Sequence, residues 1–574
     1  MSNEYVLDKL FKLFLALLAL DVYFGLLLGQ SYGIKGFSVL ILVPVFLAIA
    51  LKFRYRRNFY RMLDYLKENW GTPIEKKRNL ERTKKYHLLS KKEDEEDIID
   101  DQTWGDLTMD EIYAFLDRNL STPGEHMLYD ILRRPLKSQE EIHIRKAQID
   151  LFSRDKELRD KLRTYLYICG RERAKDGNIV ELLFKEHEFD ESMMRTCNVA
   201  AAMPLVLLCM IPFFKSAVIF PLIISFGINM YIHNKSLTSN EGLLHSIQYL
   251  SKVIKCAGEI SEINNAELNH YIEPLKGLYN KFKNMIPKAS VLAIPDNADI
   301  ILEYFKTIFL IDERNYYKII KDINSHRYEL NKVYSMVGTL DALVSIASYR
   351  DSNTGYVEPE FSKDNANINI EGLSHPLLEE AVPNDICIKG GIIITGSNMS
   401  GKSTFLRAVG VNAILAQTIV MVMAKKYEAP FLNIMTSISP QDDINEGKSY
   451  YLGEAEALLR IINNCNREYT TLCIIDEIFR GTNPIERVAA STEILKYFMA
   501  RNALVVVATH DLELTELLRD KYACYYFTED VDNEEGLKFD YKIRAGVSPT
   551  RNAIKLLDYL GYPKEIVEAA KLNS

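Results

Sequence analysis

Two long apolar runs lie close together near the N-terminus. Residues 13–28 are apolar apart from Asp21, and residues 36–51 carry no charge. Each run is slightly short of the ~20 residues that span a ~30 Å hydrocarbon core, so a buried helix pair in a soluble core is one alternative. A signal peptide is another, but a second apolar run follows at once and the first has no clear small-residue cleavage site. Five Lys and Arg residues between 52 and 61 favour a membrane hairpin over residues 1–58 with both ends in the cytoplasm.

A second apolar unit covers residues 199–232. Lys215, near its middle, is its only formal charge. Its three prolines, Pro204, Pro212 and Pro221, would destabilise soluble helices but are better tolerated in membrane helices. The pattern predicts a second membrane hairpin over these residues, with a buried hairpin of a soluble core as the alternative.

The rest of the N-terminal half is hydrophilic or periodic. Residues 59–105 are rich first in Lys and Arg and then, at 93–97, in Asp and Glu, which is typical of a solvated linker. The basic part follows the first hairpin directly, so anionic lipid headgroups are its expected partner. Residues 106–198 and 233–345 are expected to form two parts of one α-helical core. Apolar positions recur at steps of three and four at Leu243, Ile247, Leu250, Ile254 and Ala257, the pattern of an amphipathic helix.

Composition narrows the classes of function without choosing one. The 574 residues include 70 Lys and Arg against 78 Asp and Glu, a net charge of −8. This balance excludes a uniformly cationic nucleic-acid-binding surface but not a local basic face. The eight cysteines are scattered without a C-x-x-C pair, so neither a disulfide framework nor a thiolate zinc site is expected, and a reducing compartment fits.

A phosphate-binding loop is the clearest chemical motif. Residues 391–395 have the pattern of a buried strand, and an apolar helical stretch follows at 405–420. The sequence between them is G-x-x-x-x-G-K-S-T, whose backbone N–H groups and helix N-terminus favour phosphate. Lys402 is expected at the β- and γ-phosphates of ATP, and the Ser403 hydroxyl on Mg²⁺. The loop consists of Gly396, Ser397, Asn398, Met399, Ser400, Gly401, Lys402, Ser403 and Thr404.

Two further apolar strands end in residues that act on phosphates. Residues 471–475 lead into Asp476, expected to support Mg²⁺, and Glu477, expected to polarise the attacking water. Residues 503–508 lead into a Thr-His pair, which places the imidazole of His510 at the same sheet edge. An imidazole in this position is expected to sense the γ-phosphate.

Together the motifs predict a chain of mixed fold class. An α/β phosphate-loop ATPase domain is expected over residues 346–574, next to the all-α core and the two membrane hairpins. Lys402, Glu477 and His510 are its expected catalytic residues. The expected activity is Mg²⁺-dependent hydrolysis of ATP.

The C-terminal motifs resemble those of the MutS ATPases of DNA mismatch repair, over roughly residues 370–574. The family's G-P-N-M-x-G-K-S-T stands at 396–404 as G-S-N-M-S-G-K-S-T. Its D-E-I-G-R-G-T-S stands at 476–483 as D-E-I-F-R-G-T-N, and its D-D-x-x-x-G-x-S-T-F at 442–451 as D-D-I-N-E-G-K-S-Y-Y. Shorter family segments match at Ser374–Leu378, Val382–Asp385, Thr509–His510 and Gly561–Pro563.

The resemblance implies a dimeric ATPase of the ABC class, in which two chains enclose two nucleotides. Ser449 of one chain would contact the γ-phosphate bound to the other, and Asn384 would lie near the adenine. ATP-driven closure would move helical levers that grip duplex, mismatched or branched DNA, as in mismatch repair or recombination. With the two hairpins, the implied location is the cytoplasmic (inner) membrane, crossed several times, with the ATPase domain facing the cytoplasm.

A weaker resemblance extends upstream. Residues 121–136 look like the start of the family's helical core and lever. The second apolar unit interrupts that region, which soluble MutS proteins do not show. The family's N-terminal mismatch-reading domain is expected to be missing, because membrane segments and a short linker occupy its place.

The main rival interpretation is an ABC-type transporter or another membrane-remodelling ATPase that does not act on DNA. A transporter predicts an L-S-G-G-Q signature before the Asp-Glu strand and about six longer spans lining a path. The sequence has no such signature, and its apolar runs are short. A membrane-bound interaction protein with an inactive ATPase is a further alternative, although the residues expected to handle phosphate are all intact.

Overall fold

The computed structural model describes most of the chain. The described residues are 3–91, 98–172, 178–237, 241–292, 300–362, 367–397, 400–438, 450–465, 468–479, 483–532, 536–547 and 561–572. The chain divides into two compact units, residues 1–72 with 155–168 and residues 73–154 with 169–574.

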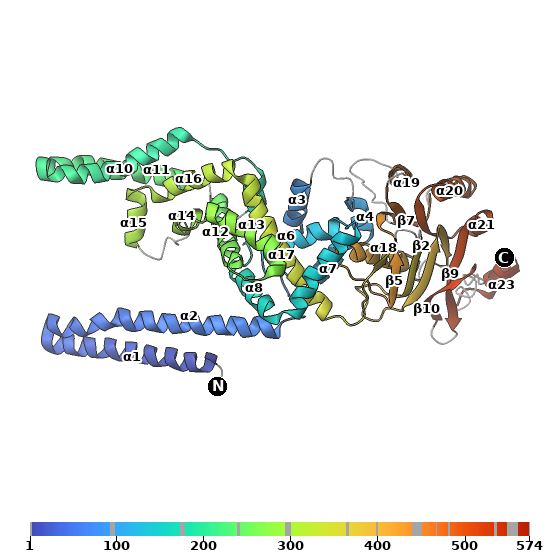
Figure 1. The fold of residues 1–574 in the computed structure, drawn as a ribbon, viewed down its shortest axis with the longest axis horizontal. Helices are drawn as coiled ribbons and strands as arrows, with labels where there is room; N and C mark the ends of the chain where they lie inside the picture. Colours follow the sequence, from blue (N-terminus) through green and yellow to red (C-terminus); the bar gives the residue numbers. More distant parts are fainter. Residues whose placement is uncertain are drawn as a thin grey trace. The chain divides into compact units, whose positions relative to one another are not determined.

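The first unit is built on a helical hairpin. α1 (Asn3–Tyr32) and α2 (Val43–Glu68) lie side by side and are joined by the 3₁₀ segment η1 (Gly33–Leu42), as Figure 1 shows. An ion pair of 2.6 Å between Arg57 Nη1 and Asp8 Oδ1 links the two helices at the charged end of the hairpin. The ion pairs between the two helices therefore lie at this end, whereas Asp21, 7% exposed, is buried further along α1.

One more helix, α8 (Lys156–Cys169), completes this unit over residues 155–168. The Arg159 guanidinium lies 4.0 Å from the centre of the Trp70 ring, and Arg163 donates a hydrogen bond to the carbonyl of Leu66. The end of α2 is thus fixed by cation–π and hydrogen-bond contacts with a segment 90 or so residues further along the chain.

Three helical stretches among the described residues are long and apolar enough to cross a membrane: Glu4–Tyr32, Lys35–Glu68 and Glu191–Lys235. The third is divided into α10 (Glu191–Phe214) and α11 (Ile219–Leu237), which fold back on each other through a short 3₁₀ turn (Figure 1). Both predicted hairpins are therefore present as helix pairs, and their place in a membrane stays a prediction.

The remainder of the helical region surrounds α17 (Arg327–Asp351), which packs against α6 (Thr122–Arg133) and α7 (Gln139–Arg154). α6 and α17 approach closely, since a Cβ on Gly338 would lie 2.4 Å from the Pro123 carbonyl oxygen. The other helices are α3 (Leu80–Ser90), α4 (Asp101–Asp106), α5 (Met109–Leu116), α9 (Ile179–Phe184), α12 (Glu241–Ser261), α13 (Asn269–Phe282), α14 (Met285–Val291), α15 (Ile300–Ile308) and α16 (Ile311–Ser325).

The predicted amphipathic helix is confirmed as α12. Its expected apolar stripe is largely buried, with Ile247, Leu250, Ile254 and Ala257 at 0–2% exposure. The period of the apolar residues therefore identified both the element and the face that it buries.

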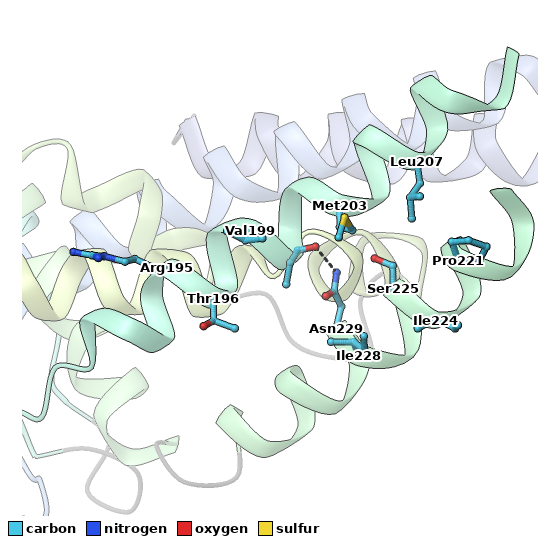
Figure 2. A pocket seen from close by; sticks show the side chains of 11 residues that line it. Arg195, Thr196, Val199, Met203, Leu207, Pro221, Ile224, Ser225, Ile228 and Asn229 are labelled. Carbon is cyan, nitrogen blue, oxygen red and sulfur yellow. Dashed lines mark hydrogen bonds between the residues drawn. The ribbon is translucent and has the colours of Figure 1, made fainter. Parts of the chain in front are cut away.

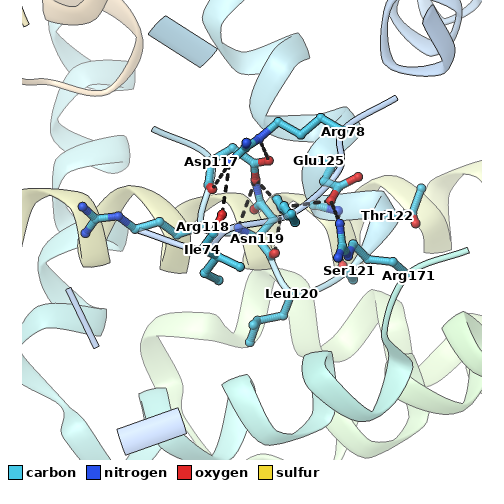
Figure 3. A network of polar contacts seen from close by, with 12 residues as sticks. Ile74, Arg78, Asp117, Arg118, Asn119, Leu120, Ser121, Thr122, Glu125 and Arg171 are labelled. Atoms are coloured by element: carbon cyan, nitrogen blue, oxygen red, sulfur yellow. Dashed lines mark hydrogen bonds and ion pairs between the residues drawn. The ribbon is translucent and has the colours of Figure 1, made fainter. Parts of the chain in front are cut away.

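Residues 59–105 were expected to form a solvated linker, but the structure shows helices and buried ion pairs there. α2 continues to Glu68, and α3 and α4 lie in the same stretch. Lys76 is buried and forms ion pairs of 2.7 Å with Asp117 and 2.9 Å with Glu125. Figure 3 shows the surrounding network, in which Arg78 lies beside Asp117. The sequence did not predict these ion pairs because the acidic partners lie about 40 positions away in the chain.

The C-terminal region contains two β-sheets. The larger has the strand order β10-β9-β4-β8-β7-β6, and all neighbouring strands are parallel except β9 and β10. Its strands are β4 (Gly391–Thr395), β6 (Leu432–Ser437), β7 (Thr470–Asp476), β8 (Ala503–Ala508), β9 (Tyr522–Asp532) and β10 (Gly536–Ala545). The three strands predicted around the phosphate motifs are confirmed as β4, β7 and β8.

The smaller sheet has the order β1-β5-β2-β3 and carries the segments that precede the loop. Its strands are β1 (Glu360–Phe361), β2 (Asn367–Leu373), β3 (Asn384–Lys389) and β5 (Lys426–Ala429). The helices of this region are α18 (Lys402–Thr418), α19 (Tyr450–Asn464), α20 (Pro484–Met499), α21 (Leu512–Leu517) and α23 (Lys564–Leu572).

Asp106, the last residue of α4, joins the helical region to the larger sheet. Its Oδ2 atom accepts hydrogen bonds from Thr436 Oγ1 at 2.7 Å and from the Ile438 N–H at 2.9 Å. Its carbonyl oxygen accepts one from Arg407 Nε, on α18, at 2.9 Å. A single residue of the helical region thus contacts both β6 and the helix that follows the glycine-rich loop.

Asp341, on α17, is fully buried and holds the start of α6. Its carboxylate accepts hydrogen bonds from the N–H groups of Leu120 and Ser121 and from the Ser121 hydroxyl, the last at 2.6 Å. Burial raises the pKa of Asp341 to about 6, against the lowering effect of these bonds.

We expect this carboxyl to make folding stability depend on pH. In the unfolded chain the Asp341 carboxyl ionises at pH ~3.9, whereas in the folded chain it keeps its proton to about pH 6. The stabilisation that it gives the folded state is therefore complete below pH ~3.9 and is lost as the pH rises through about 6. Compared with an Asp341→Asn variant, the wild-type chain should lose on the order of 2–3 kcal/mol between these pH values and nothing further above them. Thermal unfolding of both proteins from pH 4 to 8 measures this change, and a wild type that gains stability relative to the variant as pH rises would contradict the assignment.

Candidate functional site

The residues expected to handle phosphate come together because three strands are parallel. β8 pairs with β4 on one side and β7 on the other, with Ala508 opposite both Ile394 and Asp476. The carboxyl ends of parallel strands meet at one sheet edge, where α/β folds bind their ligands. The Thr509 N–H reinforces this edge with a hydrogen bond of 3.0 Å to the Ile394 carbonyl.

The glycine-rich loop leaves β4 and turns into α18. Gly396 has a φ of 143° and Gly401 a φ of 101°, conformations that favour glycine, and a Cβ on Gly396 would lie 2.9 Å from the Phe527 carbonyl oxygen. Lys402 is 3% exposed, and its ammonium group donates hydrogen bonds to the carbonyls of Gly396 at 2.6 Å and Ser397 at 2.7 Å. The loop therefore holds a buried cation directly over its own backbone.

The two predicted Mg²⁺ ligands are in contact. Ser403 Oγ donates a hydrogen bond of 2.5 Å to Asp476 Oδ2, which joins the first turn of α18 to the end of β7. Within the parts of the chain that the structure describes, no group of three or more His, Cys, Asp or Glu side chains could hold a metal ion. A hydroxyl and a carboxylate oxygen are nevertheless hard ligands of the kind that Mg²⁺ takes when phosphate and water complete its coordination.

Glu477 and His510 form a second pair at the same edge. Glu477 Oε1 lies 3.0 Å from His510 Nε2, and the Glu477 N–H donates to the Ala508 carbonyl at 2.9 Å. Glu477 has a φ of 61°, a conformation that costs about 1–3 kcal/mol for a residue with a side chain. The surrounding ladder holds this conformation, which turns the carboxylate toward the histidine.

A pair of residues in the site, Arg487 and Asp511, was not identified in the sequence analysis. Arg487, on α20, donates two hydrogen bonds to the Asp511 carboxylate, at 2.8 and 2.5 Å. These bonds raise the pKa of Arg487. Asp511 directly follows His510, so its position beside the motif was a usable signal, but its partner lies 24 positions earlier and could not be inferred. The pair braces the segment that carries the imidazole.

A cavity of about 530 Å³ lies next to the glycine-rich loop. Gly401, Ser403 and Thr404 of the loop line it together with His375. His375 belongs to the segment Ser374–Leu378, one of the shorter segments that resemble the MutS family. His375 Nδ1 accepts a hydrogen bond of 3.3 Å from the Leu377 N–H. Burial lowers the pKa of His375, and the charge of Arg407 adds to this effect, so the imidazole is neutral near pH 7. The other lining residues are Leu373, Leu378, Glu379, Glu380, Ala381, Val382, Asn384, Phe405, Ala408, Phe527 and Tyr541.

Asn384 lines the same cavity, but its amide group is occupied by backbone. Its Nδ2 atom donates to the Tyr541 carbonyl at 2.9 Å, and its Oδ1 atom accepts from the Ile543 N–H at 2.8 Å. These bonds tie the start of β3 to β10. The structure thus places Asn384 beside the loop as a residue that shapes the cavity wall.

Some expected residues lie outside the described residues. These are Asn398 and Met399 of the loop, Ser449 with most of the segment 442–451, and residues 480–482 of the Asp-Glu motif. The structure brings the following expected residues to one sheet edge: Gly396, Ser397, Ser400, Gly401, Lys402, Ser403, Thr404, Asp476, Glu477 and His510.

Comparison with known proteins finds similar sequences in one family. The family model for MutS domain V matches residues 392–574. The DNA mismatch repair protein MutS of Petrotoga mobilis is 31% identical over 280 residues, 46% of this chain and 33% of that protein. MutS of Fusobacterium nucleatum is 25% identical over 513 residues, 79% of this chain and 56% of that protein. The DNA mismatch repair protein MSH3 of Saccharomyces cerevisiae is 30% identical over 286 residues, 47% of this chain and 28% of that protein.

By its fold, the chain is a helical protein with a C-terminal α/β domain, in which a glycine-rich loop precedes the N-terminus of a helix. The C-terminal region, residues 392–574, matches MutS domain V, and the similarity to MutS proteins extends upstream at lower identity. It spans between 28% and 56% of the length of the three relatives named above.

Proposed function

We propose that the chain is a membrane-anchored ATPase of the MutS family that couples ATP to DNA binding. The main support for ATPase activity is the 2.5 Å hydrogen bond between Ser403 and Asp476. The Lys402 ammonium group and the Glu477–His510 pair lie at the same sheet edge. Each of these groups has a role in phosphoryl transfer, and all of them lie at one sheet edge.

The nucleotide would bind along the loop. The loop N–H groups, the N-terminus of α18 and Lys402 would hold the phosphates. The adenosine part would enter the cavity of about 530 Å³ lined by His375 and Tyr541, whose volume suits a small ligand. Ser403 and Asp476 would hold Mg²⁺, which neutralises phosphate charge when bound. Glu477 would orient the attacking water, and His510, braced by the Asp511–Arg487 pair, would contact the γ-phosphate.

A homodimer would complete the site. In the family arrangement, Ser449 of a second chain contacts the γ-phosphate, and this residue lies outside the described residues. Support for a coupled movement comes from Asp106, which contacts both α18 and the end of β6, immediately before the segment that carries Ser449. A change at the loop could therefore reach the helical region directly.

The relatives that match are DNA mismatch repair proteins, and DNA is the proposed partner of the helical region. The anchors proposed for this chain are the α1–α2 and α10–α11 hairpins, with the ATPase domain in the cytoplasm and the chain in the inner membrane. An ABC-type transporter is the alternative, and the match to MutS domain V favours the first proposal.

Two substitutions separate binding from hydrolysis. Lys402→Ala should weaken ATP binding by roughly 10- to 100-fold, because it removes a charged hydrogen-bond donor from the phosphates. Glu477→Gln should leave affinity within about threefold but slow hydrolysis by about 10²–10³-fold, because the carboxylate acts on the water. Equilibrium nucleotide binding and phosphate release, with and without Mg²⁺, measure both effects. Glu493→Gln, an exposed carboxylate on α20, is the matched control, and an equal loss of affinity in both variants would contradict the assigned roles.

We expect the protein to fractionate with membranes and to resist extraction by salt. Apolar spans are not released when charges are screened, whereas a purely polybasic contact is. Fractionation at low and high salt, and then with detergent, tests this expectation. Recovery of the full-length chain in the soluble fraction at low salt would rule out the anchors.

DNA binding should be steeply dependent on salt and show little preference for a mismatch. Its affinity would come from Lys and Arg contacts to phosphates, although the chain's net charge of −8 requires the basic surface to be local. Binding of the detergent-solubilised protein to homoduplex, mismatched duplex and a four-way junction at ~50 and ~200 mM salt tests this. No binding at the lower salt would redirect the ATPase to a partner other than DNA.

A further inference from the structure

The second helical hairpin contains a groove between its two helices. A cavity of about 640 Å³ separates part of α10 from α11 (Figure 2). Six side chains give it an almost wholly apolar wall: Val199, Met203, Leu207, Pro221, Ile224 and Ile228. Within the size range of ligand sites, this volume holds a small molecule or a hydrocarbon chain.

The groove is built into the fold of the hairpin. Asn229, which is 1% exposed, donates hydrogen bonds from Nδ2 to the Ala200 carbonyl at 3.1 Å and to the Ile308 carbonyl at 2.7 Å. These bonds join α11, near its midpoint, to α10 and to α15, and Figure 2 shows the first of them. The short 3₁₀ turn η2 (Lys215–Val218) joins the helices at the tip. The helices are thus joined at the tip and by the Asn229–Ala200 bond, whose two residues also line the groove.

The two ends of the groove differ chemically. Figure 2 shows Arg195 at the end near the helical core, and Leu207 and Pro221 at the opposite end. Arg195 is largely exposed, and its Nη2 atom lies 2.9 Å from Glu191 Oε1, one turn earlier on α10. The cavity therefore has a hydrocarbon-like body and a single cation at its mouth, partly balanced by a neighbouring carboxylate.

We infer that this groove binds one acyl chain of an anionic phospholipid, with the lipid phosphate at Arg195. The inference rests on the proposed membrane insertion of this hairpin. An acyl chain matches the apolar wall, and the headgroup phosphate matches the guanidinium at the level expected for the membrane surface. A transmembrane helix from another protein is a poorer match, since about 18 residues with a diameter of about 10 Å occupy about 2,000 Å³, several times the cavity of about 640 Å³.

The test uses the full chain, purified in detergent, freed of lipid and then given defined lipids. Phosphatidylglycerol and phosphatidylcholine with identical acyl chains are the probes, and native mass spectrometry counts the bound lipids while thermal unfolding measures their effect. Phosphatidylglycerol should bind about fivefold more tightly than phosphatidylcholine, as expected for one additional cation–phosphate contact.

Five variants distinguish effects of the groove from effects of the rest of the hairpin. Arg195→Gln should abolish the preference for phosphatidylglycerol, and Glu191→Gln should increase it, because the cation then faces the phosphate without a competing carboxylate. Ile228→Trp should fill the groove and displace both lipids. Lys235→Gln removes a cation of the same hairpin outside the groove, and Val206→Trp enlarges a side chain that does not line it. Both should behave as the wild type.

The outcomes separate this inference from the membrane proposal. A chain that inserts into vesicles but binds the two lipids equally, or keeps its preference in Arg195→Gln, would overturn the lipid site alone. Copurification of a second polypeptide that Ile228→Trp displaces would overturn it in favour of a helix in the groove. A chain that does not insert into vesicles at all would overturn the membrane anchoring and this site together.

Discussion

The parallel pairing of β4, β8 and β7 is the constraint on which the phosphate site depends. The pairing places Ile394, Ala508 and Asp476 in one row, so the loop, the imidazole and the carboxylates leave the sheet at the same edge. Ser403 and Asp476, 73 positions apart in the chain, thereby come within hydrogen-bond distance, at 2.5 Å. The positive φ of Glu477 is tolerated because its N–H is fixed to β8.

The same sheet is connected to the helical region by buried polar groups. Asp106 contacts Arg407 on one side and Thr436 with Ile438 on the other, and its own side chain is 3% exposed. A buried carboxylate with several donors fixes the relative positions of the elements that carry them more strongly than an apolar contact does, because losing one bond leaves a buried charge unpaired. The helical region is therefore joined to the loop helix through directional contacts.

Sequence patterns predicted the strands that are apolar along their whole length and the helix that buries one apolar face. β4, β7, β8 and α12 were located from the sequence because hydrophobic periodicity depends only on residues close in the chain. The family motifs also predicted which strand ends would meet.

Contacts between distant charges were not predictable in the same way. Lys76 was read as part of a solvated linker, yet it is buried between Asp117 and Glu125. Arg487 carried no motif, yet it braces Asp511. In each case the charge is stabilised by a partner that only the folded chain brings close. Local composition therefore gave a wrong prediction for Lys76 and no prediction for Arg487.

The second hairpin has exposed apolar side chains near its tip and paired polar side chains at its base. Phe213 and Phe220, near its tip, are 81% and 71% exposed, and such an apolar surface marks a site of contact with lipid or protein. At its base the polar side chains are paired: His233 Nδ1 lies 2.8 Å from Glu313 Oε1, and Arg314 donates to Asn198 at 2.9 Å. A hairpin in water gains nothing from keeping its tip apolar, whereas a hairpin in hydrocarbon must satisfy every polar group internally or at the surface. Under the membrane proposal, the exposed apolar side chains would face lipid, and Lys215 in the turn and the paired polar groups at the base would lie at the two membrane surfaces.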